Sequence, residues 1–188
     1  TEEAEIDDLY ADPCMAEWPA YRPVADFSQI DKAIKLLSTA KRPVIVCGQG
    51  ALISDAGDEV RALAERLNIP VGCTMTGKGT ISETHPLSIR LIGARGGTSY
   101  SNKFLETADL VFFIGSNTDS AGTDAWKLPK QSDGLKVIYL NIDGVDAGNN
   151  YRTDAVLLGD AKATVAMMVE KIKAEGVRSN AENGCEAA

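Results

Sequence analysis

Apolar residues recur every three or four positions over several long segments of the chain, which is the pattern of amphipathic helices. The first pattern begins near Ser28, a residue that can cap a helix. It places Ile30, Ala33, Ile34 and Leu37 on one face. The same spacing predicts a second helix around Val60, Leu63, Ala64 and Leu67, a third over about 99–107, and a last one from Ala161 to about 173.

Short runs that are apolar throughout separate these helices. They lie at 44–47, 69–74, 110–114, 137–142 and 155–158. Continuous apolar strands are typical of sheets covered on both faces. Their alternation with amphipathic helices predicts an α/β fold, a three-layer doubly wound, mostly parallel sheet that is Rossmann-like. The segment between the second and third runs contains His85-Pro86 and several glycines, and we expect a loop there.

The length of 188 residues and the 44% hydrophobic content predict one folded domain. Residues 1–26, acidic and interrupted by prolines, are expected to form an extended arm or interdomain linker. The central α/β domain is expected over 27–173, and the polar residues 174–188 as a flexible tail or linker. No apolar run approaches the roughly 18 residues of a membrane span, so no membrane partner is expected.

Charge and cysteine content narrow the functional classes further. The formal charge is −8, and seven of the acids lie within residues 1–17, which contain no base. The remaining body is nearly neutral, and therefore no nucleic-acid partner is predicted. Cys47 and Cys73 lie inside apolar runs and are expected to be buried thiols. The absence of any CxxC motif argues against zinc, and a reducing cytoplasm is the expected location.

Glycine follows nearly every predicted strand. Gly48 and Gly50 follow the first, Gly115 follows the run 110–114, and Gly159 follows the last. Open α/β sheets bind ligands at the carboxyl ends of their strands, where glycine lets the backbone approach closely. One interpretation of these glycines is that they form a nucleotide-binding crevice. The other is that they only allow the tight turns that join strands to helices. The sequence leaves both interpretations open.

Two glycine motifs fall short of known phosphate-binding patterns. Gly48-Gln49-Gly50 begins like the dinucleotide fingerprint, but Ile53 occupies the position of the third glycine. The stretch 72–78 fits GxxxxGK, but Gly79 replaces the serine or threonine that a P-loop requires. Neither an ordinary NAD(P) site nor a P-loop is therefore predicted.

Candidate catalytic groups are few. His85 is the only histidine and sits in a loop, so no catalytic triad is predicted. Asp119, Asp143 and Asp160 follow strands and could accept hydrogen bonds from a ribose, although Asp160 could equally cap the last helix. No catalytic residue and no metal ligand is assigned.

Several segments match a known family in collinear order over about 21–173. They are Tyr21-Arg22-Pro23, KRPVIVCGQGA (41–51), ALAERLNIPVGCTMTGKGTISETHPLS (62–88), LIGARGG (91–97), ADLVFFIGS (108–116), KVIYLNID (136–143) and AVLLGDAKATVAMM (155–168). Together they resemble the central domain of thiamine-diphosphate-dependent enzymes, the acetolactate synthase and pyruvate oxidase group.

The resemblance implies a part of a larger enzyme. Family members have a first domain that binds the pyrimidine half of thiamine diphosphate and a third that binds its diphosphate with Mg²⁺ through Gly-Asp-Gly, a motif absent here. The chain would then be a scaffold, inactive alone, with these flanking domains and further copies of itself as partners. The intact transferase or lyase would decarboxylate a 2-oxo acid and transfer a two-carbon carbanion. A free-standing nucleotide-binding or electron-transfer module of similar topology is the alternative.

The resemblance also implies a cofactor site at the strand ends. Related central domains bind FAD or ADP there, or leave the site empty, and all three stay open here. One departure concerns the loop GSNTDSAG (115–122), in which Asn117 and Ala121 stand where acetolactate synthases have arginines. Another is Gly144, which replaces a family proline. The candidate cofactor-binding residues are Gly48, Gln49, Gly50, Thr74, Met75, Gly93, Ala94, Arg95, Gly96, Gly115, Asp143, Gly159 and Asp160.

Overall fold

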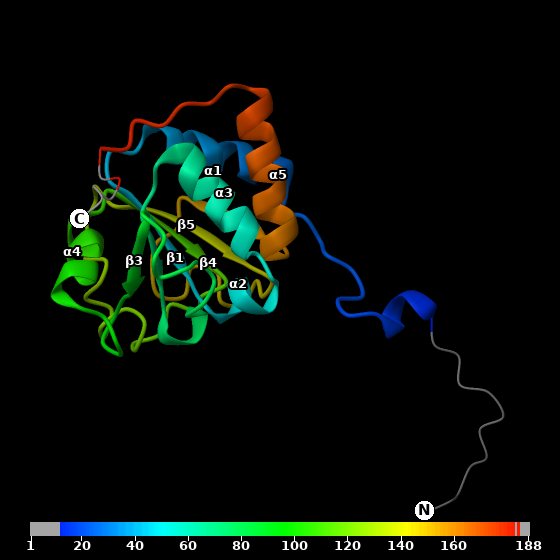
Figure 1. Ribbon diagram of the computed structural model, residues 1–188, viewed down its shortest axis with the longest axis horizontal. Coiled ribbons are helices and arrows are strands. Elements are labelled where there is room, and N and C mark those ends of the chain that lie inside the picture. The colour runs from blue at the N-terminus through cyan, green and yellow to red at the C-terminus, as the bar shows by residue number, and fades with distance from the viewer. Residues whose placement is uncertain (1–11, 183, 185–188) are drawn as a thin grey trace, which may run out of the picture.

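A six-stranded parallel sheet forms the centre of the protein in a computed structural model that describes residues 12–182 and 184 (Figure 1). Its strands are β1 (Pro43–Cys47), β2 (Val71–Cys73), β3 (Ser88–Leu91), β4 (Leu110–Ile114), β5 (Lys136–Asn141) and β6 (Ala155–Leu158). Their order across the sheet is β3-β2-β1-β4-β5-β6, and every neighbouring pair is parallel. The prediction of a doubly wound parallel sheet is confirmed.

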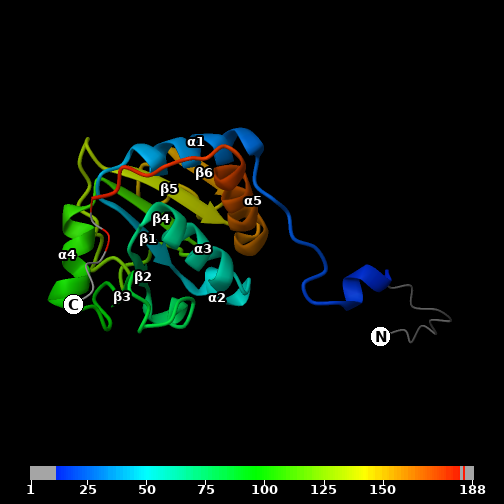
Figure 2. The ribbon, with the colours of Figure 1, turned by 45° about the horizontal axis from the view of Figure 1, so that its top comes forward.

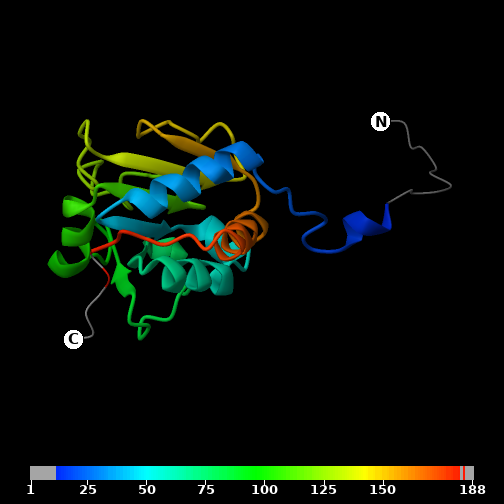
Figure 3. The same cartoon turned by 90° about the horizontal axis from the view of Figure 1, so that it is seen from above.

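Helices cover the two faces of the sheet unequally. The helical elements are η1 (Pro13–Ala16), α1 (Phe27–Thr39), α2 (Gln49–Ile53), α3 (Gly57–Leu67), η2 (Met75–Gly77), α4 (Ser99–Thr107) and α5 (Ala161–Ala174). One face packs against α1, α3 and α5, while α4 and the long loops cover the other (Figures 1 and 3). This gives the three layers that the sequence predicts.

Four helices follow the predicted spacing closely, and α1 shows why. Its buried residues are Ile30, Ala33, Ile34 and Leu37, the face expected from the sequence. The predicted cap is wrong by two positions: the carboxylate of Asp26 accepts hydrogen bonds from the main-chain N–H groups of Ser28 and Gln29. Asp26 caps better because its carboxylate lies before the first turn, whereas Ser28 is already inside the helix.

Strand β3 is absent from the prediction, which assigned its residues to a loop. The sequence Ser-Ile-Arg-Leu buries only Ile89 fully, and Arg90 has a positive φ of 64° where the pairing with β2 shifts register. An edge strand of four residues with a bulge carries neither a continuous apolar run nor clean alternation. Tertiary pairing with β2 therefore decides its structure.

The central strands are the most deeply buried part of the molecule. All residues of β1 and β4 are buried, and neighbouring Phe112 and Phe113 lie in the cores on opposite faces of the sheet. Because successive side chains of a strand point to opposite faces, one short run supplies both cores. The continuous apolar runs of the sequence therefore reflect helices or loops on both sides.

The segments that flank the domain differ in their contacts. Residues 12–17 extend away from the domain (Figure 1). After α5, the chain runs back along α1 (Figure 2), where the N–H groups of Asn180 and Glu182 donate to Ser38 and Lys41 carbonyl oxygens. The division at 26 and 173 stays a prediction. No helix among the described residues is long and apolar enough to span a membrane.

Truncating Phe112 to alanine should lower the free energy of unfolding by about 3–5 kcal/mol, because its ring is completely buried in β4 and the space cannot refill. Urea unfolding followed by circular dichroism measures this. Leu158→Ala is the control, since Leu158 is 52% exposed on edge strand β6 and should cost less than about 0.5 kcal/mol. Equal effects of the two changes would contradict the described core.

Candidate functional site

A crevice opens at the carboxyl ends of β1 and β4, where the strand order reverses. In doubly wound sheets this switch point is where ligands bind, because the turns on its two sides lead in opposite directions. The crevice has a volume of about 400 Å³. The predicted cofactor residues that line it are Gly48, Gln49, Gly50, Thr74, Met75, Arg95 and Gly115.

Three of these glycines bring the ends of β1 and β4 into direct contact. A Cβ on Gly48 would lie 2.4 Å from the Gly115 carbonyl oxygen, and one on Gly50 would lie 2.8 Å from the Gly115 Cα. Gly115 also has a positive φ of 59°, which favours glycine. These glycines are therefore required by the turn itself, whatever the crevice binds.

The main-chain N–H groups of the same turn are already engaged. Gly48 donates to the Ile114 carbonyl and Gly50 to the Gly115 carbonyl, both at 2.9 Å, while Gly115 donates to Leu140 at 2.8 Å. On the β2 side, the N–H of Thr74 donates to the Cys47 carbonyl at 2.9 Å, and the Thr74 hydroxyl accepts from Gly77 N–H. The turns therefore offer a ligand little of the free amide cluster that usually binds a diphosphate.

Three predicted residues support the crevice without lining it. Ala94 N–H donates to the Ala121 carbonyl at 2.9 Å, and a Cβ on Gly93 would lie 2.6 Å from that same oxygen. Gly96 packs near Leu91 and the Met75 methyl group. The loop after β3 thus packs against the loop after β4 and supports it.

Asp143, Gly159 and Asp160 also lie outside this crevice. Asp143 is exposed and accepts from Val145 N–H in a local turn. Gly159 and Asp160 line a second, largely apolar cavity of about 430 Å³, which arm residues 18–23 help to form. The two cavities share Gly50, Ile53, Gly115 and Asn141, so they adjoin along the strand ends.

Asp160 anchors the arm and caps α5. Its carboxylate accepts from Arg22 Nη1 at 2.9 and 3.0 Å, from Ser54 Oγ at 2.7 Å and from Ala163 N–H at 2.9 Å. Burial would raise the pKa of Asp160, but the bonds from Ala163, Ser54 and Arg22 outweigh it and lower the pKa below its usual 3.8. With four hydrogen bonds to protein groups, the side chain is committed to structure rather than to a ligand.

The loop after β4, in which the sequence analysis singled out Asp119, Asn117 and Ala121, forms one wall of the crevice. Asp119 Oδ1 accepts from Gly122 N–H at 2.7 Å, and Asn150 Nδ2 donates to the carbonyl and hydroxyl of Thr118, both at 3.1 Å. Thr118, Asp124, Ala125 and Trp126 all have positive φ between 47° and 60°. Non-glycine residues in this conformation persist only where surrounding contacts hold them.

The remaining lining residues, Ile53, Thr76, Ser116, Asn117, Ala121, Gly122, Asn141 and Asp146, were not in the predicted set. Ser116 and Asn117 closely follow β4 and Asn141 ends β5, so their position at strand ends was a usable signal, whereas Gly122 lies farther along the loop after β4. Asp146 lies farther from β5 in an irregular turn, and no sequence pattern places it here.

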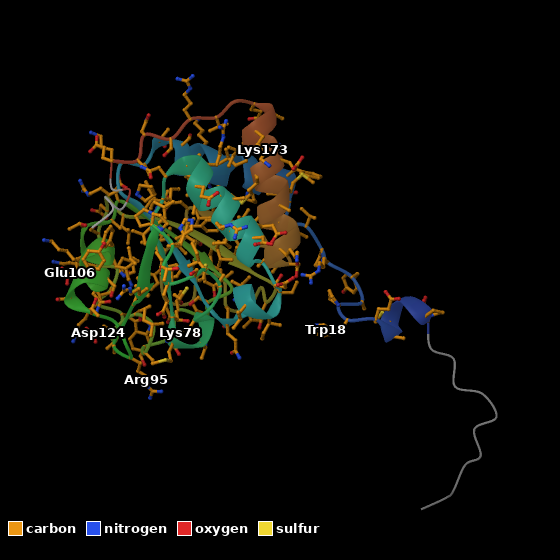
Figure 4. All side chains as sticks on the ribbon, in the orientation of Figure 1. Trp18, Lys78, Arg95, Glu106, Asp124 and Lys173 are labelled. Carbon is orange, nitrogen blue, oxygen red and sulfur yellow. The ribbon has the colours of Figure 1, made fainter. Side chains whose placement is uncertain are left out.

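The donor set of the crevice suits a diphosphate poorly. Among the described residues that line it, Arg95 is the only base, while Asp119 and Asp146 contribute carboxylates. Figure 4 shows the Arg95 side chain directed away from the domain, at the rim. Asn117 and Ala121, which also line the crevice, carry no charge. The residues present therefore do not reproduce the positive charge that an ADP or FAD diphosphate needs.

His85 and the cysteines have local roles. His85 Nε2 lies 3.0 Å from Glu65, and its Nδ1 accepts from Leu87 N–H. Cys47 and Cys73 are free, buried and paired in register between β1 and β2, as the sequence predicted for two buried thiols. The contact with Cys73, together with burial, raises the pKa of the Cys47 thiol.

The strand order and the crevice at its reversal define a doubly wound, parallel α/β domain. The chain belongs to the thiamine pyrophosphate enzyme central domain family, whose model matches residues 30–168. The family resemblance seen in the sequence is thereby confirmed.

The relatives are much longer proteins. A probable acetolactate synthase large subunit from Methanococcus aeolicus is 36% identical over 174 residues, covering 91% of this chain and 28% of its own length. Glyoxylate carboligase from Escherichia coli O157:H7 is 32% identical over 169 residues, which cover 89% of this chain and 28% of the carboligase. A solved structure from Mycobacterium smegmatis, described as a thiamin diphosphate-dependent enzyme, shares the fold with a TM-score of 0.64 at 16% sequence identity. The match covers 87% of this chain and 30% of the Mycobacterium smegmatis chain. The chain thus spans less than a third of these proteins.

Gly48→Ala should lower the free energy of unfolding by about 1–3 kcal/mol, because its methyl group would collide with the Gly115 carbonyl and the Ser116 backbone. Thermal unfolding followed by circular dichroism measures the change. Gly134→Ala is the matched control, since no atom lies within 4 Å of its added Cβ. An unchanged melting temperature in Gly48→Ala would show that the β1 and β4 turns are not in contact.

Asp160→Asn should cost about 2 kcal/mol at neutral pH, because it removes the charge from the bonds to Arg22 and Ser54. The folded pKa lies below the unfolded one, so this stability is present above about pH 4 and is lost as pH falls through the folded pKa. The difference between wild type and variant should therefore shrink on acidification in urea titrations. Asp133→Asn, at an exposed site, is the control. A difference that stayed constant with pH would rule out this ion pair.

Proposed function

We propose that this chain serves as the central scaffold domain of a thiamine-diphosphate-dependent 2-oxo acid enzyme of the acetolactate synthase type. The family match over 30–168 is the observation that carries the proposal. The curated relatives support it, because each aligns to most of this chain with less than a third of its own length. The pyrimidine- and diphosphate-binding domains are the partners that the rest of such an enzyme would supply.

The chemistry in the intact enzyme belongs to those partners. Thiamine diphosphate with Mg²⁺, held by those domains, would supply the electron sink for decarboxylation of a 2-oxo acid and transfer of the remaining two-carbon unit to an acceptor. In this chain, no group of three or more histidine, cysteine or acidic side chains within the described residues could hold a metal ion. The chain's own contribution is therefore to hold neighbouring domains in register.

The arm offers the surface for such a role. Arg22 fixes it to Asp160 and Ser54, and the N–H of Asp160 donates to the Pro23 carbonyl at 2.8 Å. Beyond this anchor, Trp18 and Tyr21 are 84% and 74% exposed. Large aromatic side chains left uncovered next to a rigid anchor favour contact with another domain or another copy. We propose that the intact enzyme is a homo-oligomer and is located in the cytoplasm.

The crevice at β1 and β4 is the place where an FAD or ADP of related central domains would lie. Its position and the adjoining cavity support a ligand of nucleotide length, while its charge argues against the diphosphate. The same switch-point crevice is what favours the alternative, a self-contained nucleotide-binding or electron-transfer module. The scaffold domain would be needed for carboligation by the intact enzyme, whereas the self-contained module would not take part in carboligation.

A chimera tests the scaffold role. Residues 21–173 would replace the matching segment of the Methanococcus aeolicus relative, and the purified chimera should bind thiamine diphosphate and form acetolactate from pyruvate. The chain alone should form none and should show no thermal shift with thiamine diphosphate and Mg²⁺. The unaltered relative is the positive control. A folded chimera that binds thiamine diphosphate yet forms no acetolactate, or turnover by the isolated chain, would contradict the proposal.

A further inference from the structure

Two free thiols lie side by side on neighbouring strands of the sheet. Cys47 ends β1 and Cys73 ends β2, and the two residues are paired directly in the register of these parallel strands. Both belong to the core that α1, α3 and α5 cover, so their side chains project from the same face of the sheet. Neighbouring strands lie about 4.8 Å apart. The Cα atoms of a disulfide are separated by about 4.4–6.8 Å, so this pairing places the two sulfur atoms within reach of a covalent bond.

A disulfide between these positions would be strained. The side chains of paired residues stand parallel at about the 4.8 Å strand spacing, whereas the Cβ atoms of a disulfide lie about 3.5–4.5 Å apart. The backbone has little freedom to close this difference, because Thr74 N–H donates to the Cys47 carbonyl at 2.9 Å and a Cβ on Gly77 would lie 2.2 Å from that same oxygen. Strained disulfides are reduced more easily than relaxed ones. A bond here would therefore be reversible.

The two thiols differ in access and in acidity. Cys73 is 4% exposed, whereas Cys47 is completely buried. The contact with Cys47 lowers the pKa of the Cys73 thiol, and the main-chain N–H groups of Ile81 and Thr80 lower it further, against burial and the nearby Glu83. The same contact between the thiols, together with burial, raises the pKa of Cys47. In redox-sensitive pairs the more acidic and more accessible thiol is oxidised first, and its neighbour then resolves it.

From the strand register, the shared face and the difference in exposure, we propose that Cys47 and Cys73 are a modification site at which hydrogen peroxide forms a reversible disulfide. The Cys73 sulfur attacks one peroxide oxygen, the O–O bond breaks, and the departing oxygen takes up a proton and leaves as water. Cys47 then loses its proton, and its sulfur displaces hydroxide from the Cys73 sulfenic acid as a second water forms. Two thiols are thereby oxidised to one disulfide, and one peroxide is reduced to two waters.

A small thiol such as glutathione reverses the reaction. Its thiolate attacks the more accessible Cys73 sulfur, and Cys47 leaves and takes up a proton. A second glutathione displaces Cys73 from the mixed disulfide, which restores both protein thiols and releases oxidised glutathione.

The bond would act on the crevice at the strand ends. Gly48 follows Cys47 directly, Thr74 and Met75 follow Cys73, and all three line the crevice. A link between the two cysteines therefore ties two of its walls together. This inference goes beyond the proposed scaffold role and does not rest on it.

Peptide mapping of the oxidised full chain tests for the bond. A background with Cys14→Ser and Cys185→Ser leaves Cys47 and Cys73 as the only thiols. Far-UV circular dichroism and the melting temperature would first show that this protein is folded. After treatment with hydrogen peroxide and alkylation of the remaining thiols, trypsin should release residues 42–61 joined to residues 67–78. Incubation with glutathione before digestion should return the two peptides in separate, alkylated form.

Two single variants in the same background separate the two thiols. Cys47→Ala should stop at the Cys73 sulfenic acid, which dimedone traps. Cys73→Ala leaves only the completely buried thiol, which should react with peroxide about tenfold more slowly. In urea the two variants should react at similar rates, because the difference comes from the fold.

The inference would be overturned if the two peptides stayed separate after oxidation of the folded protein, if they joined only in urea, or if glutathione failed to separate them. Equal or faster oxidation of Cys47 in the folded single variants would contradict it as well. None of these results touches the scaffold role, because the chimera measures acetolactate formation independently of thiol oxidation in the isolated chain.

Discussion

The close approach of β1 and β4 at their carboxyl ends is the constraint on which the rest of the structure depends. Gly48 and Gly50 pack against Gly115 with no space for a side chain between them. This contact lets the chain turn from β1 into α2 in one direction and from β4 into its long loop in the other. The crevice is the space between the turn that leads into α2 and the loop that follows β4. Its existence is therefore a property of the backbone, whereas its occupant depends on side chains that the backbone leaves free.

Most of the fold could be predicted from the sequence, because burial on both faces makes the strand runs continuous and the helix faces periodic. The helix over 99–107 and the strands at 110–114 and 155–158 agree with the structure residue for residue. Two short elements that the sequence did not predict share one cause. Strand β3 and helix α2 are short, and tertiary contacts rather than local pattern hold them. The cap of α1 was misplaced for a local reason, since a carboxylate two residues earlier competes for the same N–H groups.

The candidate site was harder to predict, because it combines residues with different reasons for being there. Glycines at strand ends mark the place, but they serve the turn first. Asp160 follows the last strand as a ligand residue would, yet it holds Arg22 and caps α5. Asp119, which the sequence analysis named for its position after a strand, does line the crevice, whereas Asp146 enters it through an irregular turn that no periodicity describes. Position at a strand end thus predicts the neighbourhood of a site more reliably than it predicts a residue's role.

The central place of β1 has a consequence for how the molecule assembles. β1 pairs with β2, which follows soon after it in the chain, and with β4, which comes much later. While the protein is being synthesised, the edge of β1 that pairs with β4 must wait with its hydrogen-bonding groups open. Pairings between distant segments form slowly, because a long loop must close first. The early half of the domain is therefore the part most exposed to misassociation before β4 arrives.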